Sequence, residues 1–413
     1  MGKGFGGNAC ERIRVTESAT LMSSRHVIER KRILFVIGSL AIGGAERHVV
    51  AVAAALARRG WHPTVFALTP KGPLLESLAK AGVPVVGPTI PALWSKILGP
   101  RLNAWVCAVL SLKMIAIDLL RYRGTIAHFF LPAAYILGGL AACLVNSHPC
   151  IMSRRSLNFY QKKNYFFTRI EKFLHPRMDV LVGNSHAVVN ELKIETQGRC
   201  PVRLIYNGIE FEPATHSARE TKRIELGLDN NRLVIIMVAN LISYKGHEDL
   251  LVALDLIKEI MPVCWSLLLI GRDDGIGNFL KERAKLLGID ANVLWLGSRL
   301  DVHECLAAAD IAVSASHEEG FSNSVLEAMK EGLPTVVTDV GGNPEAVENG
   351  VTGYVVPCRD PIALGDAILK LALDPKRAEL GARGRSRVKE RFSMDACINA
   401  YERLYFDLAN ERK

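Results

Sequence analysis

The sequence predicts an α/β protein made of two domains, each a doubly wound parallel sheet, that face each other across a cleft. Three observations support this prediction. The chain has 413 residues, which is long for one domain. Short β-rich apolar runs alternate with helical patterns along its length, as in parallel βα repeats. A strand followed by a glycine-containing loop and a helix occurs twice, beginning at Ile33 and at Leu233.

The chain is expected to divide at a turn formed by Asn207 and Gly208. The expected parts are an N-terminal extension (1–30), a first domain (31–208), a second domain (209–392) and a final amphipathic helix that returns to the first domain (393–413).

Seven β-rich runs predict the first sheet: Ile33–Gly38, Thr64–Leu68, Val83–Val86, Thr125–Phe129, Cys150–Ser153, Val180–Asn184 and Val202–Tyr206. Gly43 and Gly44 lie between the first strand and a helix at Glu46–Arg58. Glycines in such a loop let the backbone approach a ligand and leave helix N–H groups open for phosphate. The alternative is a tight turn that binds nothing.

Six further runs predict the second sheet: Leu233–Val238, Trp265–Gly271, Val293–Gly297, Ile311–Ser314, Thr335–Thr338 and Tyr354–Val356. Lys245 lies in the loop after the first of these, just before a helix. A lysine at this place can reach a diphosphate as a point charge. The alternative is a solvent-exposed lysine at a helix start.

The stretch from Ser316 to Pro357 carries the strongest signal in the chain. Its loop contains Glu319, and its helix, expected from Ser324 to Lys330, contains Glu327 eight residues later. Ser322, Asn323 and Ser324 offer side chains that cap a helix. Open parallel sheets bind ligands outside the carboxyl ends of their strands, so both acids are expected to line one pocket. The alternative is a solvated loop acid and an ordinary helix glutamate.

This stretch resembles the donor-site signature of the retaining glycosyltransferases of family 4, which have the GT-B fold of two Rossmann-like domains. The matching residues are Glu319, Gly320, Phe321, Glu327, Gly332, Pro334, Gly341, Gly342 and Glu345. The loop from Gly43 to Glu46 and the turn from Asn207 to Ile209 also resemble this family. The resemblance spans Lys31 to Leu408.

The resemblance implies metal-independent, retaining transfer of a sugar from a UDP- or GDP-linked donor to a lipid-linked or polysaccharide acceptor, with no permanently bound cofactor. Glu327 would hold the ribose and Glu319 the sugar hydroxyls, while Lys245 would face the diphosphate. The implied catalytic residues are Glu319, Lys245 and His128. The implied donor site consists of Gly43, Gly44, Asn240, Lys245, Arg272, Glu319, Gly320, Phe321, Ser322, Asn323, Ser324 and Glu327.

Two positions depart from the family pattern. Phe130 stands where family members often have a second histidine after His128, and Asn240 stands at the usual arginine, which leaves Arg272 as a replacement cation. His128 then has the alternative of a hydrogen-bonded histidine at a strand end. The alternative for the whole protein is a weak or inactive nucleotide-binding scaffold. An NAD-dependent oxidoreductase is disfavoured, because the loop between the first strand and its helix, with Gly43 and Gly44, does not read GxGxxG.

The two halves of the chain differ in charge. Residues 1–208 carry 27 Lys and Arg against 10 Asp and Glu, whereas residues 209–413 carry 24 against 32. A basic half indicates an anionic partner, such as a phospholipid surface, a lipid phosphate or nucleic acid. The alternative is a basic surface that only aids solubility.

Two segments of the basic half bear on this choice. Asn103–Leu120 is apolar but contains two charges, so we expect a buried or amphipathic helix and not a spanning one. Tyr160–Leu174 mixes aromatic and basic residues, which favours a membrane-interface helix over a nucleic-acid face. An amphipathic helix with a basic solvent face is the alternative. We expect a cytoplasmic protein, peripheral on the inner membrane, that binds no nucleic acid.

The nine cysteines are scattered, with no CxxC pair and no Cys/His spacing typical of a metal site. Reduced, mostly buried thiols and no bound metal are therefore expected, as in a cytosolic protein.

Overall fold

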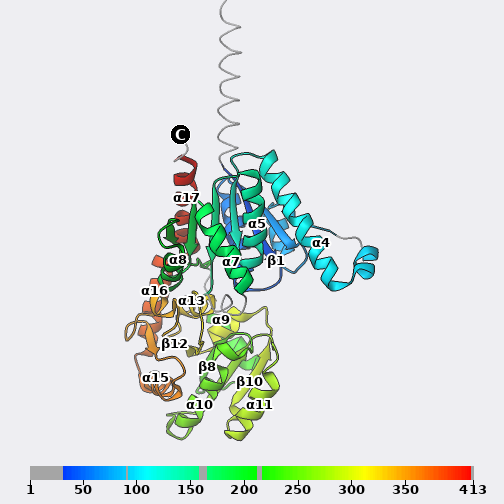
Figure 1. Cartoon of the computed structure of the whole chain (residues 1–413). Helices are drawn as coiled ribbons and strands as arrows, with labels where there is room; N and C mark the ends of the chain where they lie inside the picture. Colours follow the sequence, from blue (N-terminus) through cyan, green and yellow to red (C-terminus); the bar gives the residue numbers. More distant parts are fainter. Residues whose placement is uncertain (1–30, 90–91, 158–164, 212–215, 411–413) are drawn as a thin grey trace, which may run out of the picture.

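A computed structural model of the chain describes residues 31–89, 92–157, 165–211 and 216–410. It contains two parallel sheets, one in each predicted domain, which confirms the expected fold class (Figure 1). The predicted extension at 1–30 and the start of the segment Tyr160–Leu174 lie outside the described residues.

The first sheet has seven parallel strands in the order β3-β2-β1-β4-β5-β6-β7. They are β1 (Arg32–Ser39), β2 (His62–Thr69), β3 (Val85–Val86), β4 (Ile126–Phe130), β5 (Cys150–Arg154), β6 (Val180–Gly183) and β7 (Val202–Leu204). β3 is shorter than the predicted run from Val83, because Pro84 has no N–H to donate to a neighbouring strand.

Helices cover both faces of the first sheet. They are α2 (Gly44–Arg58), α3 (Leu75–Lys80), α4 (Ala92–Arg121), α5 (Pro132–Val145), α7 (Tyr165–Leu174) and α8 (His186–Thr196). One buried apolar cluster joins the sheet to α2 and α3, and another joins it to α4, α5, α7 and α8. The sheet is therefore buried on both sides, which explains why its strands are continuous apolar runs and not alternating ones.

The second sheet has six parallel strands in the order β10-β9-β8-β11-β12-β13. They are β8 (Leu233–Val238), β9 (Trp265–Ile270), β10 (Val293–Gly297), β11 (Ile311–Ser314), β12 (Thr335–Thr338) and β13 (Gly353–Val356). The helices of this half are α9 (His216–Glu225), α10 (His247–Ile257), α11 (Gly277–Leu286), α12 (Val302–Ala308), α13 (Asn323–Lys330), α14 (Asn343–Ala346), α15 (Pro361–Leu373) and α16 (Arg377–Arg391).

Three helices were not anticipated: α5, α9 and the four-residue α14. In α5, a Cβ on Gly138 would overlap the ring of Phe129, and a Cβ on Gly139 would press on Leu174. Glycines lower helix propensity, but here they let α5 pack closely on β4 and α7. In contrast, the sequence of α9 has no apolar stripe long enough to indicate a helix.

The last helix, α17 (Met394–Asn410), leaves the second domain and packs against the first, as expected (Figure 1). Glu402 accepts hydrogen bonds from Arg59 Nη1 at 2.7 Å and from Trp61 Nε1 at 2.8 Å. Within the core, Tyr401 OH lies 3.2 Å from His48 Nε2, and Tyr405 OH lies 2.9 Å from a ring nitrogen of His128.

Burial lowers the pKa of both His48 and His128 well below the usual value, so both rings are neutral at pH 7. A neutral imidazole has one N–H donor and one acceptor nitrogen, which two hydroxyl partners can satisfy. For His128 these partners are Tyr405 and Ser153 Oγ, the latter at 2.7 Å. The tyrosines of α17 therefore complete the first domain's polar core.

We predict that Tyr405→Phe lowers the free energy of unfolding by about 1 to 3 kcal/mol, because it leaves a buried nitrogen of His128 without a partner. Urea unfolding at pH 7.5 measures the effect. Tyr165→Phe is the matched control: Tyr165 is 76% exposed, and its loss of a hydroxyl should change stability by less than about 0.5 kcal/mol. Equal stability of the two variants would contradict the prediction.

Candidate functional site

An ion pair joins two loops at the carboxyl edge of the second sheet. Nζ of Lys245, from the loop between β8 and α10, lies 2.5 Å from Oε1 of Glu319, in the loop after β11. Ser316 Oγ donates a hydrogen bond to the same oxygen at 2.9 Å. β8 and β11 are neighbours in the sheet, so their following loops lie side by side. Both charged side chains are mostly buried.

The lysine loop needs a glycine directly after Lys245. Gly246 has a φ of 73°, in the left-handed region. A Cβ on Gly246 would also overlap the carbonyl group of Ala315, at the end of β11. The glycine therefore lets the lysine loop lie directly against the loop that carries Glu319.

We call residues 315–322 the acidic loop. It leads into α13, whose N-cap residue is Ser322. Ser322, Asn323 and Ser324 were expected to cap this helix, but the side chain of Ser322 makes no capping hydrogen bond. Its Oγ lies 3.1 Å from Ser324 Oγ instead. The N-cap side chain thus leaves the first N–H groups of α13 open, and with the helix dipole they form a site suited to an anion.

A turn formed by Gly341 and Gly342, which we call the glycine turn, packs against the backbone of the acidic loop. Gly341 has a φ of 54°, and a side chain there would overlap the carbonyl group of Glu319. Gly342 N–H donates to Gly320 O at 2.9 Å. Phe321 is buried against the rings of Tyr206 and Phe392. These contacts fix the backbone that places Glu319.

Glu327 lies on α13, one turn after the open N–H groups. Burial raises the pKa of its carboxyl, while the nearby positive charges of Arg47 and Lys330 oppose the rise. Arg47 belongs to the first turns of α2 in the first domain, so Glu327 senses a charge from across the domain junction.

The glycine-containing loop of the first domain meets the start of α13 at this junction. Gly43 is the N-cap of α2, and the carbonyl of Gly44 accepts a hydrogen bond from Asn323 Nδ2 at 3.5 Å. The structure thus brings together Gly43, Gly44, Lys245, the acidic loop and α13, which lie at the carboxyl edges of both sheets.

Asn240 and Arg272 lie together after β8 and β9. Asn240 Oδ1 accepts from Arg272 N at 3.2 Å, and Arg272 Nε donates to Asp274 Oδ1 at 2.6 Å. Asn240 Nδ2 also donates to Asp274, at 3.2 Å. The side chain of Arg272 is largely exposed. Arg272 therefore places a positive charge beside Asn240, the position at which the family pattern has an arginine.

Two family models match the chain, one over each domain. Residues 218–387 match the family described as glycosyl transferases group 1, and residues 42–212 match Glycosyltransferase Family 4. Together the two matches cover both domains. The chain belongs to the group 1 glycosyltransferases of the GT-B fold.

Two curated relatives are similar over part of their length. N-acetyl-alpha-D-glucosaminyl L-malate synthase of Bacillus anthracis is 29% identical over 236 residues, 57% of this chain and 61% of the relative. The lipopolysaccharide core biosynthesis mannosyltransferase LpsB of Rhizobium meliloti is 29% identical over 249 residues, 57% of this chain and 68% of the relative. The match thus spans less than two thirds of the first relative's length.

Solved structures share the arrangement of both domains. HepE of Anabaena in complex with UDP superposes with a TM-score of 0.77 at 22% identity, over 91% of this chain and 100% of HepE. WaaG, a glycosyltransferase involved in lipopolysaccharide biosynthesis, gives a TM-score of 0.69 at 17% identity, over 92% of this chain and 100% of WaaG. At these identities the likeness concerns the fold.

The structure places the remaining predicted residue of this glycosyltransferase, His128, inside the first domain. His128 is completely buried, and both ring nitrogens contact hydroxyl groups, of Tyr405 and Ser153. Phe130 is buried as well, with its ring centroid 4.3 Å from that of His128. This arrangement favours the alternative of a strand-end histidine that stabilises the core.

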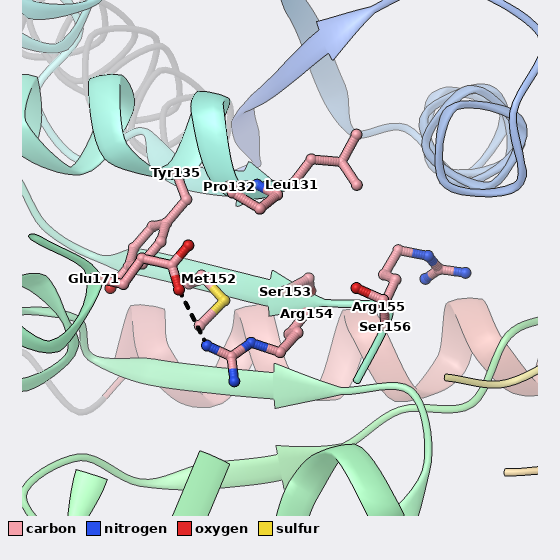
Figure 2. Close-up of a pocket in the computed structure, with 9 residues that line it drawn as sticks. All are labelled: Leu131, Pro132, Tyr135, Met152, Ser153, Arg154, Arg155, Ser156 and Glu171. Carbon is pink, nitrogen blue, oxygen red and sulfur yellow. Dashed lines mark hydrogen bonds and ion pairs between the residues drawn. The ribbon is translucent and has the colours of Figure 1, made fainter. Parts of the chain in front are cut away.

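Two adjacent arginines at the carboxyl end of β5 differ in their surroundings. Arg154 is buried and forms ion pairs with Glu171 at 3.2 Å and with Glu195 at 2.7 Å. Figure 2 shows Arg154 directed toward Glu171, whereas Arg155 extends to the opposite side. The pocket between them has a volume of about 20 Å³, enough for one water molecule but not for a sugar. Arg154 is thus part of the core, and Arg155 faces the domain junction.

Sequence reasoning overlooked three residues at this junction: Arg155, Asn207 and Arg47. Arg155 Nη2 donates to Asn207 Oδ1 at 2.5 Å, and Asn207 Nδ2 donates to Phe321 O at 3.0 Å. Asn207 had been assigned only to the turn between the domains. Its place just after β7, at the carboxyl edge of the sheet, was the signal that could have identified it.

The eight cysteines among the described residues form no disulfide. The ligand atoms of His148, Cys150 and Asp179 lie within 4.8 Å of one another, a grouping that the sequence spacing did not reveal. Asp179 Oδ2 already accepts from His148 Nδ1 at 2.8 Å and from Cys150 N at 2.7 Å. The trio lies at the amino ends of β5 and β6, opposite the edge that carries the site.

Glu345 links the glycine turn of the second domain to a helix of the first. Its carboxylate accepts from His186 N at 2.9 Å and from Ala187 N at 3.3 Å, at the start of α8. Burial and the negative charge of Glu345 raise the pKa of Tyr206 to about 12. A carboxylate from one domain therefore satisfies helix N–H groups of the other.

We predict that Glu345→Ala lowers the free energy of unfolding by about 0.5 to 2 kcal/mol, the usual range for loss of a helix N-cap. Glu345→Gln keeps one acceptor oxygen without the charge, so its loss should be smaller. Urea unfolding of both variants beside the parent protein tests this order. A Gln variant less stable than the Ala variant would contradict it.

Proposed function

We propose that the protein is a retaining glycosyltransferase that moves a sugar from a nucleoside diphosphate sugar to a lipid-linked or polysaccharide acceptor. The observation that carries the proposal is the contact of Lys245 with Glu319 beside the open N-terminus of α13. A cation, a carboxylate and free N–H groups at one sheet edge match the phosphates and hydroxyls of such a donor.

The diphosphate would bind the N–H groups of α13 and take over Lys245 as its counter-ion. Glu319 would then be free to accept hydrogen bonds from hydroxyls of the sugar. Glu327, one turn along α13, would hold the ribose. Arg272, whose side chain is largely exposed, would supply further positive charge to the phosphates.

In the transfer step, the bond between the anomeric carbon and the phosphate oxygen breaks, and the diphosphate leaves with the electron pair. The acceptor hydroxyl forms the new bond from the same face and releases its proton to the diphosphate or to water. Negative charge grows on the leaving group, so Lys245 and the dipole of α13 stabilise the transition state more than the ground state.

The names of similar proteins support particular substrates. HepE has been solved with UDP-glucose, at 23% identity and a TM-score of 0.77, which supports a UDP-linked donor here. LpsB acts in lipopolysaccharide core biosynthesis, which supports a lipid-linked glycan acceptor. Because Lys245 and α13 already supply positive charge at the leaving group, we propose transfer without a metal ion.

We predict that Lys245→Ala and Glu319→Gln each reduce sugar transfer about 100-fold, because each removes an interaction with the donor in the transition state. The donor is first chosen by a thermal-shift screen of UDP- and GDP-linked sugars, and turnover is followed by nucleotide release with EDTA present. Near-parental turnover in both variants would refute the assignment of these residues.

Lys285→Ala and Glu282→Gln provide matched controls, since these residues form an exposed ion pair on α11, 2.8 Å apart. Both control variants should keep parental turnover. Calorimetry with UDP and GDP tests the alternative of a scaffold: nucleotide binding without turnover of any donor would favour it over an enzyme.

We also propose that the first domain binds an anionic membrane surface through α4, α5 and α7. Figure 1 shows α5 between the other two helices. Asn103–Leu120 was expected to form a buried or amphipathic helix, and it lies within the helical stretch Gly99–Arg121, of whose apolar window 17% is buried. Among the described residues it alone is long and apolar enough to cross a membrane, which by itself is weak support for a span.

The exposed apolar side chains of these helices form what we call the apolar helix surface: Leu102, Trp105, Val109, Ile117, Leu120, Leu144, Tyr165, Phe166, Phe167 and Phe173. Trp105 is 72% exposed and Phe166 is 69% exposed. Exposed cations lie on the same helices, among them Lys113, Arg121, Arg169 and Lys172. Aromatic and aliphatic groups interspersed with cations suit the headgroup region of an anionic bilayer.

We predict that the protein sediments with phosphatidylglycerol vesicles at low salt and is released as the salt concentration rises, because counter-ions screen its basic residues. Trp105→Glu and Phe166→Glu should each reduce the bound fraction several-fold. Leu286→Glu is the control, since Leu286 is 80% exposed on α11 of the second domain. A parent protein that stays in the supernatant would disprove membrane binding.

A further inference from the structure

A chain of hydrogen bonds crosses from the first domain to the acidic loop and returns. Arg155 Nη2 donates to Asn207 Oδ1 at 2.5 Å. Asn207 Nδ2 donates to Phe321 O at 3.0 Å and to Asn323 Oδ1 at 2.7 Å. Asn323 Nδ2 in turn donates to Gly44 O at 3.5 Å. We call Arg155, Asn207, Asn323 and Gly44 the amide relay.

The direction of the relay follows from the chemistry of its first member. A guanidinium has only donors, so the amide of Asn207 must turn its oxygen toward Arg155. Its NH₂ group must then face the second domain, where both of its hydrogens find acceptors, Phe321 O and Asn323 Oδ1. This contact in turn orients Asn323, whose own NH₂ group faces the glycine loop of the first domain.

Asn207, the central residue of the relay, is buried. Asn207 is 2% exposed, so a lost partner could not be replaced by bulk water. Backbone contacts run parallel to it: Asn184 Nδ2 donates to Arg155 O at 3.4 Å, and a Cβ on Gly320 would overlap that same carbonyl group. The segment after β5 and the acidic loop are therefore in direct contact.

We infer that Asn207, oriented by Arg155, is a positioning residue that holds the acidic loop and the N-terminus of α13 in register with the glycine loop of the first domain. The relay touches the backbone at Phe321, two residues after Glu319, and the side chain of the first residue of α13. The relay therefore positions both the carboxylate of Glu319 and the open N–H groups at the start of α13. Its link to sugar transfer rests on the proposed function.

Asn207→Asp tests this role with almost no change in shape. The aspartate keeps an acceptor for Arg155 and gains an ion pair, so the variant should fold and melt cooperatively. Its second oxygen, however, would face Phe321 O and Asn323 Oδ1, where the parent has donors, and like partial charges repel each other. The acidic loop should lose its support while the core stays intact.

Hydrogen–deuterium exchange measures that loss without any ligand. In Asn207→Asp we expect exchange about tenfold faster than in the parent across residues 318–324, the change in opening that follows from the loss of one hydrogen bond. Asn399→Asp is the matched control: Asn399 accepts from Arg59 Nη1 at 2.6 Å on the exposed side of α17. Unchanged exchange at 318–324 in the Asn207 variant would overturn the relay.

Calorimetry with UDP and GDP then links the relay to the donor site. We expect Asn207→Asp to bind the preferred nucleotide about tenfold more weakly, and Asn399→Asp to bind it as the parent does. Arg155→Met, which frees the amide of Asn207 to rotate, should shift affinity in the same direction, and the double variant should lose less than the sum of both. Parental affinity in Asn207→Asp would overturn the inference.

The two measurements separate failure of the inference from failure of the proposed function. Faster exchange with no nucleotide bound by the parent protein would leave the relay in place and reject the glycosyltransferase. Nucleotide binding by the parent protein, together with unchanged exchange in the Asn207→Asp variant, would reject the relay and leave the proposed function in place.

Discussion

The contact between Lys245 and Glu319 is the interaction on which the site depends, because two mostly buried charges are costly unless each faces the other. Their loops meet only because Gly246 lies against the end of β11 and because Gly341 and Gly342 lie against the acidic loop. A bound diphosphate would replace the carboxylate as the partner of the lysine. The ion pair thus holds the two loops together, and in the proposed function a donor diphosphate would exchange with one of its members.

The architecture was readable from the sequence because buried parallel strands are short apolar runs and each is followed by a loop or helix start. For the same reason Lys245 and Glu319 could be placed at one sheet edge. The contact between His128 and Tyr405 could not be predicted, because the two residues lie 277 positions apart and no local pattern encodes their pairing. For α4 the sequence left a buried and an amphipathic helix open, since a core helix and a lipid-facing helix can have the same composition.

Three kinds of contact join the domains, and each depends on a different type of interaction. Glu345 offers a charge to the helix dipole of α8, the amide relay offers directed hydrogen bonds, and α17 offers a large apolar face. The first two lie beside the acidic loop and involve few groups, and the relay is buried at Asn207. The third is buried and extensive, so rotation of one domain against the other must leave it intact.

The return of α17 has a consequence for how the protein is made. Tyr401 and Tyr405 supply hydroxyl groups to His48 and His128, yet they lie on α17, after the whole second domain, and are separated from these histidines by 353 and 277 residues. On the ribosome, the N-terminal half emerges with a polar core that lacks these partners until α17 has been synthesised. The usual order in which an N-terminal domain folds completely before the next is synthesised therefore does not apply to this protein.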